Sequence, residues 1–198
     1  MCKFFETIKI KDGSIYNIEW HQRRYEQTLQ LFDEFKVYDL AKMIQPPIGE
    51  GLFRCKLVYT PQSIIDIAYF PYQKRQITSL KLIDADLEYS YKYLNRSALD
   101  ALFMQKGECD DVLIIKDALI TDTTIANVAF FDETEWLTPK KPLLYGTTRA
   151  RYIEQKRLKP IDITPSMLQS FSKIALLNAM IDFDIITIKE LQKDRVVC

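Results

Sequence analysis

The feature that most constrains the fold is a series of short β-branched and aromatic runs, broken by turn residues, in both halves of the chain. In the first half, Asp12-Gly13 joins two such runs as a hairpin signal, and further runs follow within residues 52–84. In the second half, similar runs fill residues 111–139 and 173–188. Helical stripes lie between them, so the pattern predicts an α+β protein.

Four helices are expected between these runs. Ile18, Tyr25 and Leu29 recur with helical spacing and predict the first of them. The last begins at Thr164-Pro165, where threonine can cap a helix and proline takes its first position. The expected helices cover residues 18–35, 95–107 and 146–157 and a segment that starts at residue 164.

Composition excludes several classes of partner. The 198 residues include 27 basic and 27 acidic side chains, so no net charge would hold a nucleic acid or an anionic membrane. Apolar runs are too short for a membrane span, and the first ten residues lack the apolar core of a signal peptide. The four cysteines contain no CxxC pair, which argues against a zinc site. We therefore expect a cytoplasmic protein with a small-molecule or protein partner and no metal.

Lys92 stands out in the stretch YSYKYLNRSALD. A lysine at a strand end is ordinarily solvated, but aromatic neighbours can remove water and favour the neutral amine. A neutral amine can attack a carbonyl and form a Schiff base, as in pyridoxal-phosphate enzymes. Such a site also needs a carboxylate at the pyridine nitrogen, donors around the phosphate and a wall for the substrate. The sequence offers candidates for all of these groups.

Several segments identify a family in which these groups occur together. The chain carries, in this order, FFETIKIKDG, HQRRYEQT, YKYLNR, LITDTTIANVAFF, WLTP, LLYGTTR and LLNAM. In order and context they resemble the class IV aminotransferase family, which includes branched-chain and D-amino-acid aminotransferases and 4-amino-4-deoxychorismate lyase. The resemblance extends from Phe5 to about Ile186.

The resemblance implies a two-domain fold like that of D-amino-acid aminotransferase. A small α+β domain is expected over residues 1–88, and a larger cofactor-binding domain with a mixed β-sheet or barrel and flanking helices over residues 89–198. Because the chain starts almost at the Phe-Glu-Thr motif, the small domain is expected to be shortened. The family also implies a homodimer, in which the partner subunit completes each active site.

The resemblance further implies roles for individual residues. Lys92 would hold pyridoxal phosphate and move protons at the substrate carbon. Arg24 would bind the phosphate, with Arg23 as the register alternative and a solvated or salt-bridged arginine as the ordinary interpretation. Thr147 and Thr148 would bind the phosphate at a helix N-terminus, although a capped helix alone would look the same.

Other positions complete the expected site. The turn at Asn178 and Ala179 would approach the phosphate. Thr7, Lys9 and Tyr91 are possible substrate contacts by position alone. His21 is expected to be a packed helix residue. Asn95 and Arg96 are expected to support the lysine segment, with Asn95 as a possible N-cap.

Asp122 is a departure from the family pattern. The family usually has glutamate here, and its carboxylate keeps a proton on the pyridine nitrogen. The shorter aspartate leaves four interpretations: a closer strand, a bridging water, weaker electronic tuning, or a structural aspartate in a turn.

The lysine and LLNAM motifs resemble those of 4-amino-4-deoxychorismate lyase. That enzyme releases p-aminobenzoate and pyruvate in folate biosynthesis and needs no amino acceptor. Two alternatives stay open: an amino-acid transaminase of the same family, for branched-chain or D-amino acids, and a non-catalytic relative that keeps the fold.

Overall fold

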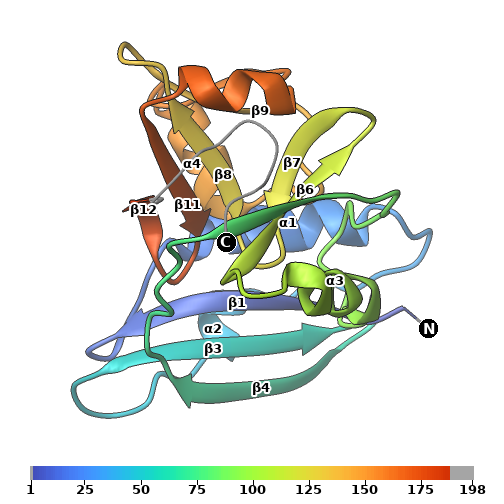
Figure 1. Cartoon of the computed structure of the whole chain (residues 1–198). Helices are drawn as coiled ribbons and strands as arrows, with labels where there is room; N and C mark the ends of the chain where they lie inside the picture. Colours follow the sequence, from blue (N-terminus) through green and yellow to red (C-terminus); the bar gives the residue numbers. More distant parts are fainter. Residues whose placement is uncertain (1, 188–198) are drawn as a thin grey trace. The chain divides into compact units, whose positions relative to one another are not determined.

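The computed structural model describes residues 2–187, which form two compact units (Figure 1). Unit 1 contains the chain up to Lys74 together with Tyr91–Asn95, and unit 2 contains Arg75–Ser90 and the chain from Arg96. The division therefore differs from the single boundary expected between residues 88 and 89. The reason is that the chain leaves unit 1 and returns to it for the five residues that carry Lys92.

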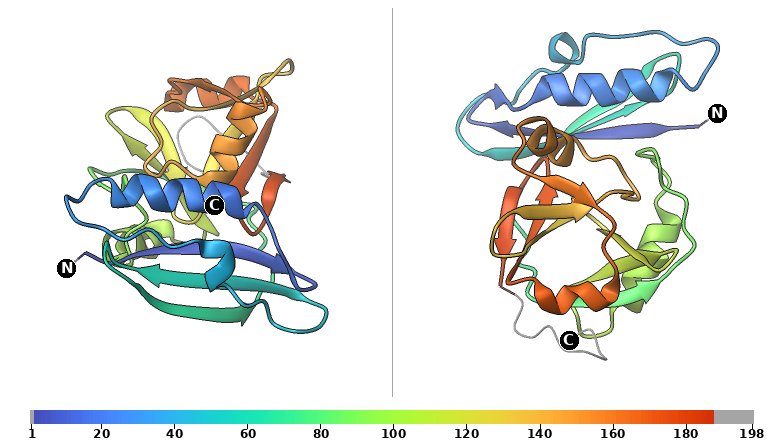
Figure 2. Two further views of the ribbon diagram at one scale, coloured as in Figure 1. Left: turned by 180° about the vertical axis from the view of Figure 1, so that it is seen from behind. Right: turned by 90° about the horizontal axis from the view of Figure 1, so that it is seen from above.

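Unit 1 is an antiparallel sheet with one long helix. Asp12 and Gly13 have positive φ angles of 49° and 74°, as the predicted hairpin requires. The sheet order is β2-β1-β3-β4, and α1 is the long helix in blue (Figure 2). The elements are β1 (Phe4–Lys11), β2 (Ser14–Ile15), α1 (Ile18–Leu29), α2 (Leu40–Met43), β3 (Leu52–Tyr59) and β4 (Ile64–Pro71).

One face of this sheet forms the core of unit 1. Phe4, Ile8 and Ile10 alternate along β1 and are buried together with Tyr25 and Leu29 of α1. Alternation along a strand sends the intervening side chains to the opposite face. The sheet therefore has one apolar face toward α1 and one face of different chemistry.

Unit 2 is built on a mixed sheet, as expected. Its strand order is β10-β9-β8-β7-β6-β5, and β11 pairs with β8 and β12. The pairs β5–β6 and β9–β10 are parallel, whereas the other neighbours are antiparallel. The strands are β5 (Leu80–Asp84), β6 (Asp111–Lys116), β7 (Leu119–Thr123), β8 (Asn127–Phe131), β9 (Trp136–Pro139), β10 (Lys159–Ile161), β11 (Lys173–Asn178) and β12 (Asp182–Ile186).

Helical segments accompany this sheet. The main ones are α3 (Ser97–Phe103) and α4 (Thr147–Glu154), with 3₁₀ turns η1 (Met104–Lys106) and η2 (Pro165–Ser170). The apolar side chains of the strands, such as Val128, Phe130 and Ile174, form the main core. The α+β fold class predicted from the sequence is confirmed.

Several predicted helix boundaries were wrong. The first helix ends at Leu29 rather than at residue 35. The segment at Thr164 starts as predicted, with Thr164 in the N-cap position and Pro165 first, but it is a 3₁₀ helix. The helix expected from Asn95 begins at Ser97 with Arg96 in the N-cap position, so Asn95 is not its N-cap. Within residues 2–187, no helix is long and apolar enough to cross a membrane, and no group of three or more acidic, histidine or cysteine side chains could hold a metal.

Candidate active site

Lys92 lies in a short segment that pairs with the start of β1. The Phe5 amide donates to the Lys92 carbonyl at 3.0 Å, and the Leu94 amide donates to the Lys3 carbonyl at 2.8 Å. These bonds fix the backbone on both sides of the lysine. The Lys92 Nζ lies 4.6 Å from the centroid of the Phe5 ring. The aromatic neighbourhood predicted for this lysine is therefore present, although its ring is Phe5 of β1. Tyr91 packs, partly buried, against the unit 1 core.

A buried carboxylate organises the rest of unit 1. Glu6 is fully buried on the α1 side of β1, where it accepts hydrogen bonds from two residues of α1. Arg24 donates from Nε to one oxygen at 2.8 Å and from Nη2 to the other, and His21 Nδ1 lies 2.6 Å from Glu6. This paired contact is the arrangement in which guanidinium and carboxylate bind most strongly. It explains why the Phe-Glu-Thr and His-x-x-Arg motifs occur together.

Burial and the neighbouring charges shift the pKa values of Glu6 and His21. Burial alone would raise the pKa of Glu6, but the Arg24 charge and the hydrogen bonds from His21 and Arg24 outweigh it and lower that pKa to about 2. Burial lowers the pKa of His21, more than the Glu6 hydrogen bond raises it. Glu6 is therefore ionised and His21 is neutral with its proton on Nδ1. His21 is a packed helix residue, as predicted.

Arg24 is held in place, whereas Arg23 is on the surface. The Arg24 side chain is 13% exposed and its direction is fixed by Glu6. Arg23 is exposed, and its guanidinium lies over the Trp20 ring at 4.5 Å. Arg24 is therefore the salt-bridged arginine of the ordinary interpretation, and its role as phosphate ligand stays a prediction.

Thr7 and Lys9 lie on the sheet face away from α1. In the strand register, Thr7 is opposite Lys56 and Lys9 is opposite Arg54 of β3. The Lys9 Nζ lies 5.6 Å from the centroid of the Tyr16 ring. Both predicted substrate contacts thus belong to a face that carries several cations.

In unit 2, Asp122 is also a buried carboxylate, with 4% of its surface exposed. Its Oδ1 accepts a hydrogen bond from Asn127 Nδ2 at 2.7 Å, and its Oδ2 accepts one from the Leu144 amide at 2.9 Å. The same Asn127 amide nitrogen donates to the Leu144 carbonyl at 2.8 Å. Asn127 therefore joins Asp122 of β7 to the loop before α4.

The partners of Asp122 are mostly neutral. Burial raises its pKa from 3.8 to about 6, and the donors from Leu144 and Asn127 and the charge of Arg149 offset only part of that rise. A carboxylate in such a place is stabilised by any additional positive charge. That is the property required of a partner for a protonated pyridine nitrogen.

The N-terminus of α4 follows directly in the chain. Gly146 is its N-cap, and Thr147 and Thr148 are buried in its first turn. A Cβ on Gly146 would lie 2.0 Å from Asn127 Oδ1, so any other residue here would displace the Asn127 side chain. The helix start and Asp122 are therefore tied through one side chain, Asn127.

Arg149 leaves a buried donor without a partner. The side chain is 4% exposed, and its Nη2 donates to the Pro139 carbonyl at 2.7 Å. Within residues 2–187, its Nε is buried and has no hydrogen-bond partner. A buried unpaired donor is costly, and here it belongs to a cation in the first turn of α4. The groups of unit 2 therefore suit an anionic cofactor that also carries a basic nitrogen.

Asn178 and Ala179 lie at the turn between β11 and β12, but the Asn178 side chain has local partners. Its Oδ1 accepts from the Met180 and Ile181 amides at 2.9 and 3.1 Å, and its Nδ2 donates to the Ile125 carbonyl at 3.2 Å. The side chain shapes this turn. Any anion contact from Asn178 and Ala179 would come from the backbone.

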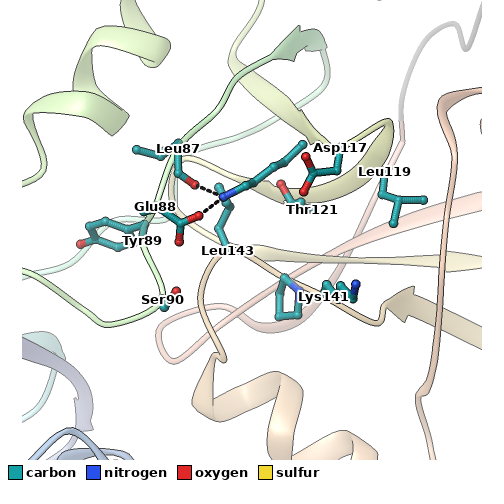
Figure 3. Close-up of a pocket in the computed structure, with 11 residues that line it drawn as sticks. Leu87, Glu88, Tyr89, Ser90, Asp117, Leu119, Thr121, Lys141 and Leu143 are labelled. Carbon is teal, nitrogen blue, oxygen red and sulfur yellow. Dashed lines mark hydrogen bonds and ion pairs between the residues drawn. The ribbon is translucent and has the colours of Figure 1, made fainter. Parts of the chain in front are cut away.

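Unit 2 also contains a pocket of about 220 Å³ (Figure 3). The Lys116 ammonium donates to the Leu87 carbonyl at 3.1 Å and pairs with Glu88 beside it. Thr121 and Leu143 of its wall are chain neighbours of Asp122 and Leu144. The lining comprises Leu87, Glu88, Tyr89, Ser90, Lys116, Asp117, Leu119, Thr121, Lys141, Pro142 and Leu143, so none of the predicted site residues lines it.

Comparisons with known proteins agree with the fold and the motifs. The model of the amino-transferase class IV family matches residues 3–190. An uncharacterized protein from Haemophilus influenzae is 36% identical over 186 residues, 91% of this chain and 98% of its own. A crystal structure from Haemophilus somnus 129PT, described as a candidate 4-amino-4-deoxychorismate lyase, is 38% identical with a TM-score of 0.85 and covers 91% of this chain and 97% of its own.

A more distant structure shares the fold. The pyridoxal-phosphate-bound form of a hypothetical aminotransferase from Mycobacterium tuberculosis has a TM-score of 0.78 at 18% identity and covers 99% of this chain and 83% of its own. The chain therefore belongs to the class IV aminotransferase family, whose members depend on pyridoxal phosphate. It is an enzyme of this class, a lyase or an aminotransferase.

Sequence reasoning missed three residues of these clusters. Glu6 was noted only as part of a motif, although its place among Phe4 and Ile8 on the core face of a strand signals a buried carboxylate. Asn127 gave no signal, because its role depends on Asp122 and the Leu144 backbone. Arg149 follows the predicted Thr147 and Thr148, and only its burial distinguishes it from a surface arginine.

Proposed function

We propose that this protein is a pyridoxal-phosphate-dependent lyase that converts 4-amino-4-deoxychorismate to p-aminobenzoate and pyruvate. The observation that carries the proposal is the 38% identity, across nearly the whole of both chains, to the Haemophilus somnus protein described as a candidate for this activity. The YKYLNR and LLNAM motifs support it, because they resemble the lyases more than the branched-chain aminotransferases.

In this proposal, unit 1 supplies the reactive amine and one phosphate ligand. The Lys92 Nζ anchors the cofactor and later takes the proton from the amine-bearing carbon of the substrate. The Arg24 guanidinium binds the phosphate, and Glu6 supports this role by fixing the direction of the arginine.

Residues of unit 2 would bind the pyridine nitrogen and the phosphate. The Asp122 carboxylate would accept a hydrogen bond from the protonated pyridine nitrogen, and Thr147 and Thr148 would donate to the phosphate at the start of α4. The backbone at Asn178 and Ala179 would add donors. The Arg149 Nε, which has no hydrogen-bond partner among the described residues, supports an anion at this helix start.

When bound, pyridoxal phosphate supplies an electron sink that stabilises negative charge on the amine-bearing carbon. The protein's own residues then hold the substrate and keep water away. Thr7, Lys9 and Tyr91 are the proposed substrate contacts. Loss of pyruvate makes the substrate ring aromatic, so no amino acceptor is needed.

We also propose a cytoplasmic homodimer, because the family completes each active site from a partner subunit. Sedimentation at assay concentration should give twice the 23.3 kDa chain mass. A fully active monomer would contradict this part of the proposal.

The test of the function uses purified protein loaded with pyridoxal phosphate. Pyruvate and p-aminobenzoate should appear in equal amounts from 4-amino-4-deoxychorismate without any keto acid. Amino-group transfer from a panel of branched-chain and D-amino acids to 2-oxoglutarate should be absent or much slower. Transfer without pyruvate release would identify a transaminase instead.

A further inference from the structure

The face of the unit 1 sheet away from α1 is strongly basic. Across β1, β3 and β4, one row of this face is Thr7, Lys56 and Ala68, and the next is Lys9, Arg54 and Phe70. The Arg54 guanidinium lies 5.0 Å from the centroid of the Phe70 ring. Cations on neighbouring rows repel one another, so this face is suited to an anion.

Two ammonium groups on this face share one aromatic ring. The Lys92 Nζ lies 4.6 Å from the Phe5 ring centroid, and the Lys56 Nζ lies 5.7 Å from the same centroid. Phe5 itself is buried, with 8% exposure. Because all three residues belong to unit 1, this arrangement is fixed by the register of β1 with β3 and by the pairing of the Lys92 segment with β1.

Within the described residues, Lys56 has no acidic partner of its own. Among residues 2–187, no carboxylate lies within ion-pair distance of its Nζ. The acidic residue on the nearest row is Asp66 of β4, which is exposed and lies opposite Val58. A half-buried ammonium near a second cation gains most from an anionic ligand.

We propose that Lys56 is a specificity residue that binds a carboxylate of the substrate. This inference rests on the proposed function, in which Lys92 reacts at the amine-bearing carbon. The Nζ atoms of Lys56 and Lys92 both lie at the Phe5 ring. When the amine of a six-membered substrate ring is at Lys92, Lys56 is therefore placed to bind a carboxylate on the opposite side of that substrate ring. An α-amino acid differs, because its amine and α-carboxylate share one carbon. The substrate class is therefore a cyclic amine with a carboxylate across the ring.

The test compares two ligands that differ only in this charge. Calorimetry measures how tightly the cofactor-loaded enzyme binds p-aminobenzoate and p-aminobenzamide. The proteins compared are wild type, Lys56→Met, Lys56→Gln, Lys56→Arg and the control Lys11→Met. Lys11 lies on the same face at the far end of β1 and is exposed. Wild type, Lys56→Arg and Lys11→Met should prefer the carboxylate. Lys56→Met and Lys56→Gln should bind it about tenfold more weakly and bind the amide unchanged.

Steady-state kinetics give an independent measure. Lys56→Met should raise the KM for 4-amino-4-deoxychorismate about tenfold with little change in kcat, because a binding contact equal in ground and transition states is lost. Equal ligand preference in wild type and Lys56→Met, or no preference in wild type, would overturn the inference. Carboxylate preference that depends on Lys56 in a protein without lyase turnover would instead reject the proposed function and keep the carboxylate site.

Discussion

Each unit buries a carboxylate whose pKa is strongly shifted, and the two pKa values are shifted in opposite directions. Glu6 of unit 1 and Asp122 of unit 2 are 0% and 4% exposed. The pKa of Glu6 is lowered to about 2, whereas that of Asp122 is raised to about 6. Burial raises both, so the difference comes from the partners: Glu6 contacts a guanidinium directly, and Asp122 is bonded to two neutral donors.

Because of this difference, we interpret Glu6 as a structural carboxylate and Asp122 as a carboxylate that can bind a cationic group of a ligand. Glu6 already has its positive charge and holds Arg24 in one direction. Asp122 has two hydrogen bonds but lacks a directly bonded cation within residues 2–187. A protonated pyridine nitrogen would supply one, so the comparison favours Asp122 as the ring partner over a purely structural aspartate.

The largest expected effect concerns the amine of unit 1. Lys92→Ala should abolish turnover and remove the borohydride-reducible link to pyridoxal phosphate, because the proposed covalent anchor is lost. The matched control is Lys36→Ala, since Lys36 also lies over an aromatic ring in unit 1, at 4.9 Å from the Tyr38 centroid. Absorption spectra and pyruvate assays measure both variants. A reducible link that persists in Lys92→Ala would refute the assignment.

The second effect tests Asp122 by charge. Asp122→Asn should reduce kcat about 100-fold or more, because the amide cannot keep the pyridine nitrogen protonated. Asp122→Glu keeps the negative charge, so its kcat should fall much less. Steady-state kinetics of the two variants decide the matter, and equal losses would indicate a structural aspartate.

The third effect tests Glu6 by stability. Glu6→Gln should lower the free energy of unfolding by about 4 kcal/mol at pH 7, because it leaves the Arg24 charge unpaired. The folded pKa is below the unfolded one, so this stabilisation is present above pH 4.5 and is lost as the pH falls toward 2. Urea denaturation at several pH values measures it, with Glu19→Gln on the exposed side of α1 as control. A loss that stays constant down to pH 2 would contradict the account.

The smallest effect is the pH dependence from Asp122 in the cofactor-free protein. The pKa of Asp122 is higher in the folded than in the unfolded protein. Its contribution to the free energy of unfolding is therefore fully present below pH 3.8 and is lost as the pH rises through about 6. Relative to Asp122→Asn, wild type should therefore lose up to about 3 kcal/mol between pH 4 and 6 and change little above that. If the free energies of unfolding of wild type and Asp122→Asn changed in parallel with pH, the pKa of Asp122 would not be raised in the folded protein.

The sequence predicted what depends on contiguous motifs. The family and the α+β class followed from segments such as YKYLNR and LLYGTTR. The predicted end of α1 was wrong because Phe32 continues the apolar stripe in the sequence. In the structure, Phe32 packs on the same core from the turn after Leu29. Asn127 could not be predicted, because its function arises from contacts with residues five and 17 positions away.

The electrostatic difference between the carboxylates was equally invisible in the sequence. Glu6 and Asp122 both lie in β-rich runs, and neither has a basic residue beside it in the chain. Arg24 reaches Glu6 only because α1 packs on β1, and Leu144 reaches Asp122 only through the loop before α4. The assignment of cofactor roles to these residues stays a prediction.

The most direct measurement is a carbon-13 NMR titration of Asp122 and Glu6 without and with pyridoxal phosphate, with Asp122→Asn and Glu6→Gln to identify the signals. The account predicts that Asp122 titrates near pH 6 without cofactor and stays ionised to clearly lower pH with it, whereas Glu6 stays ionised in both. An Asp122 titration that the cofactor leaves unchanged would contradict its role as the ring partner.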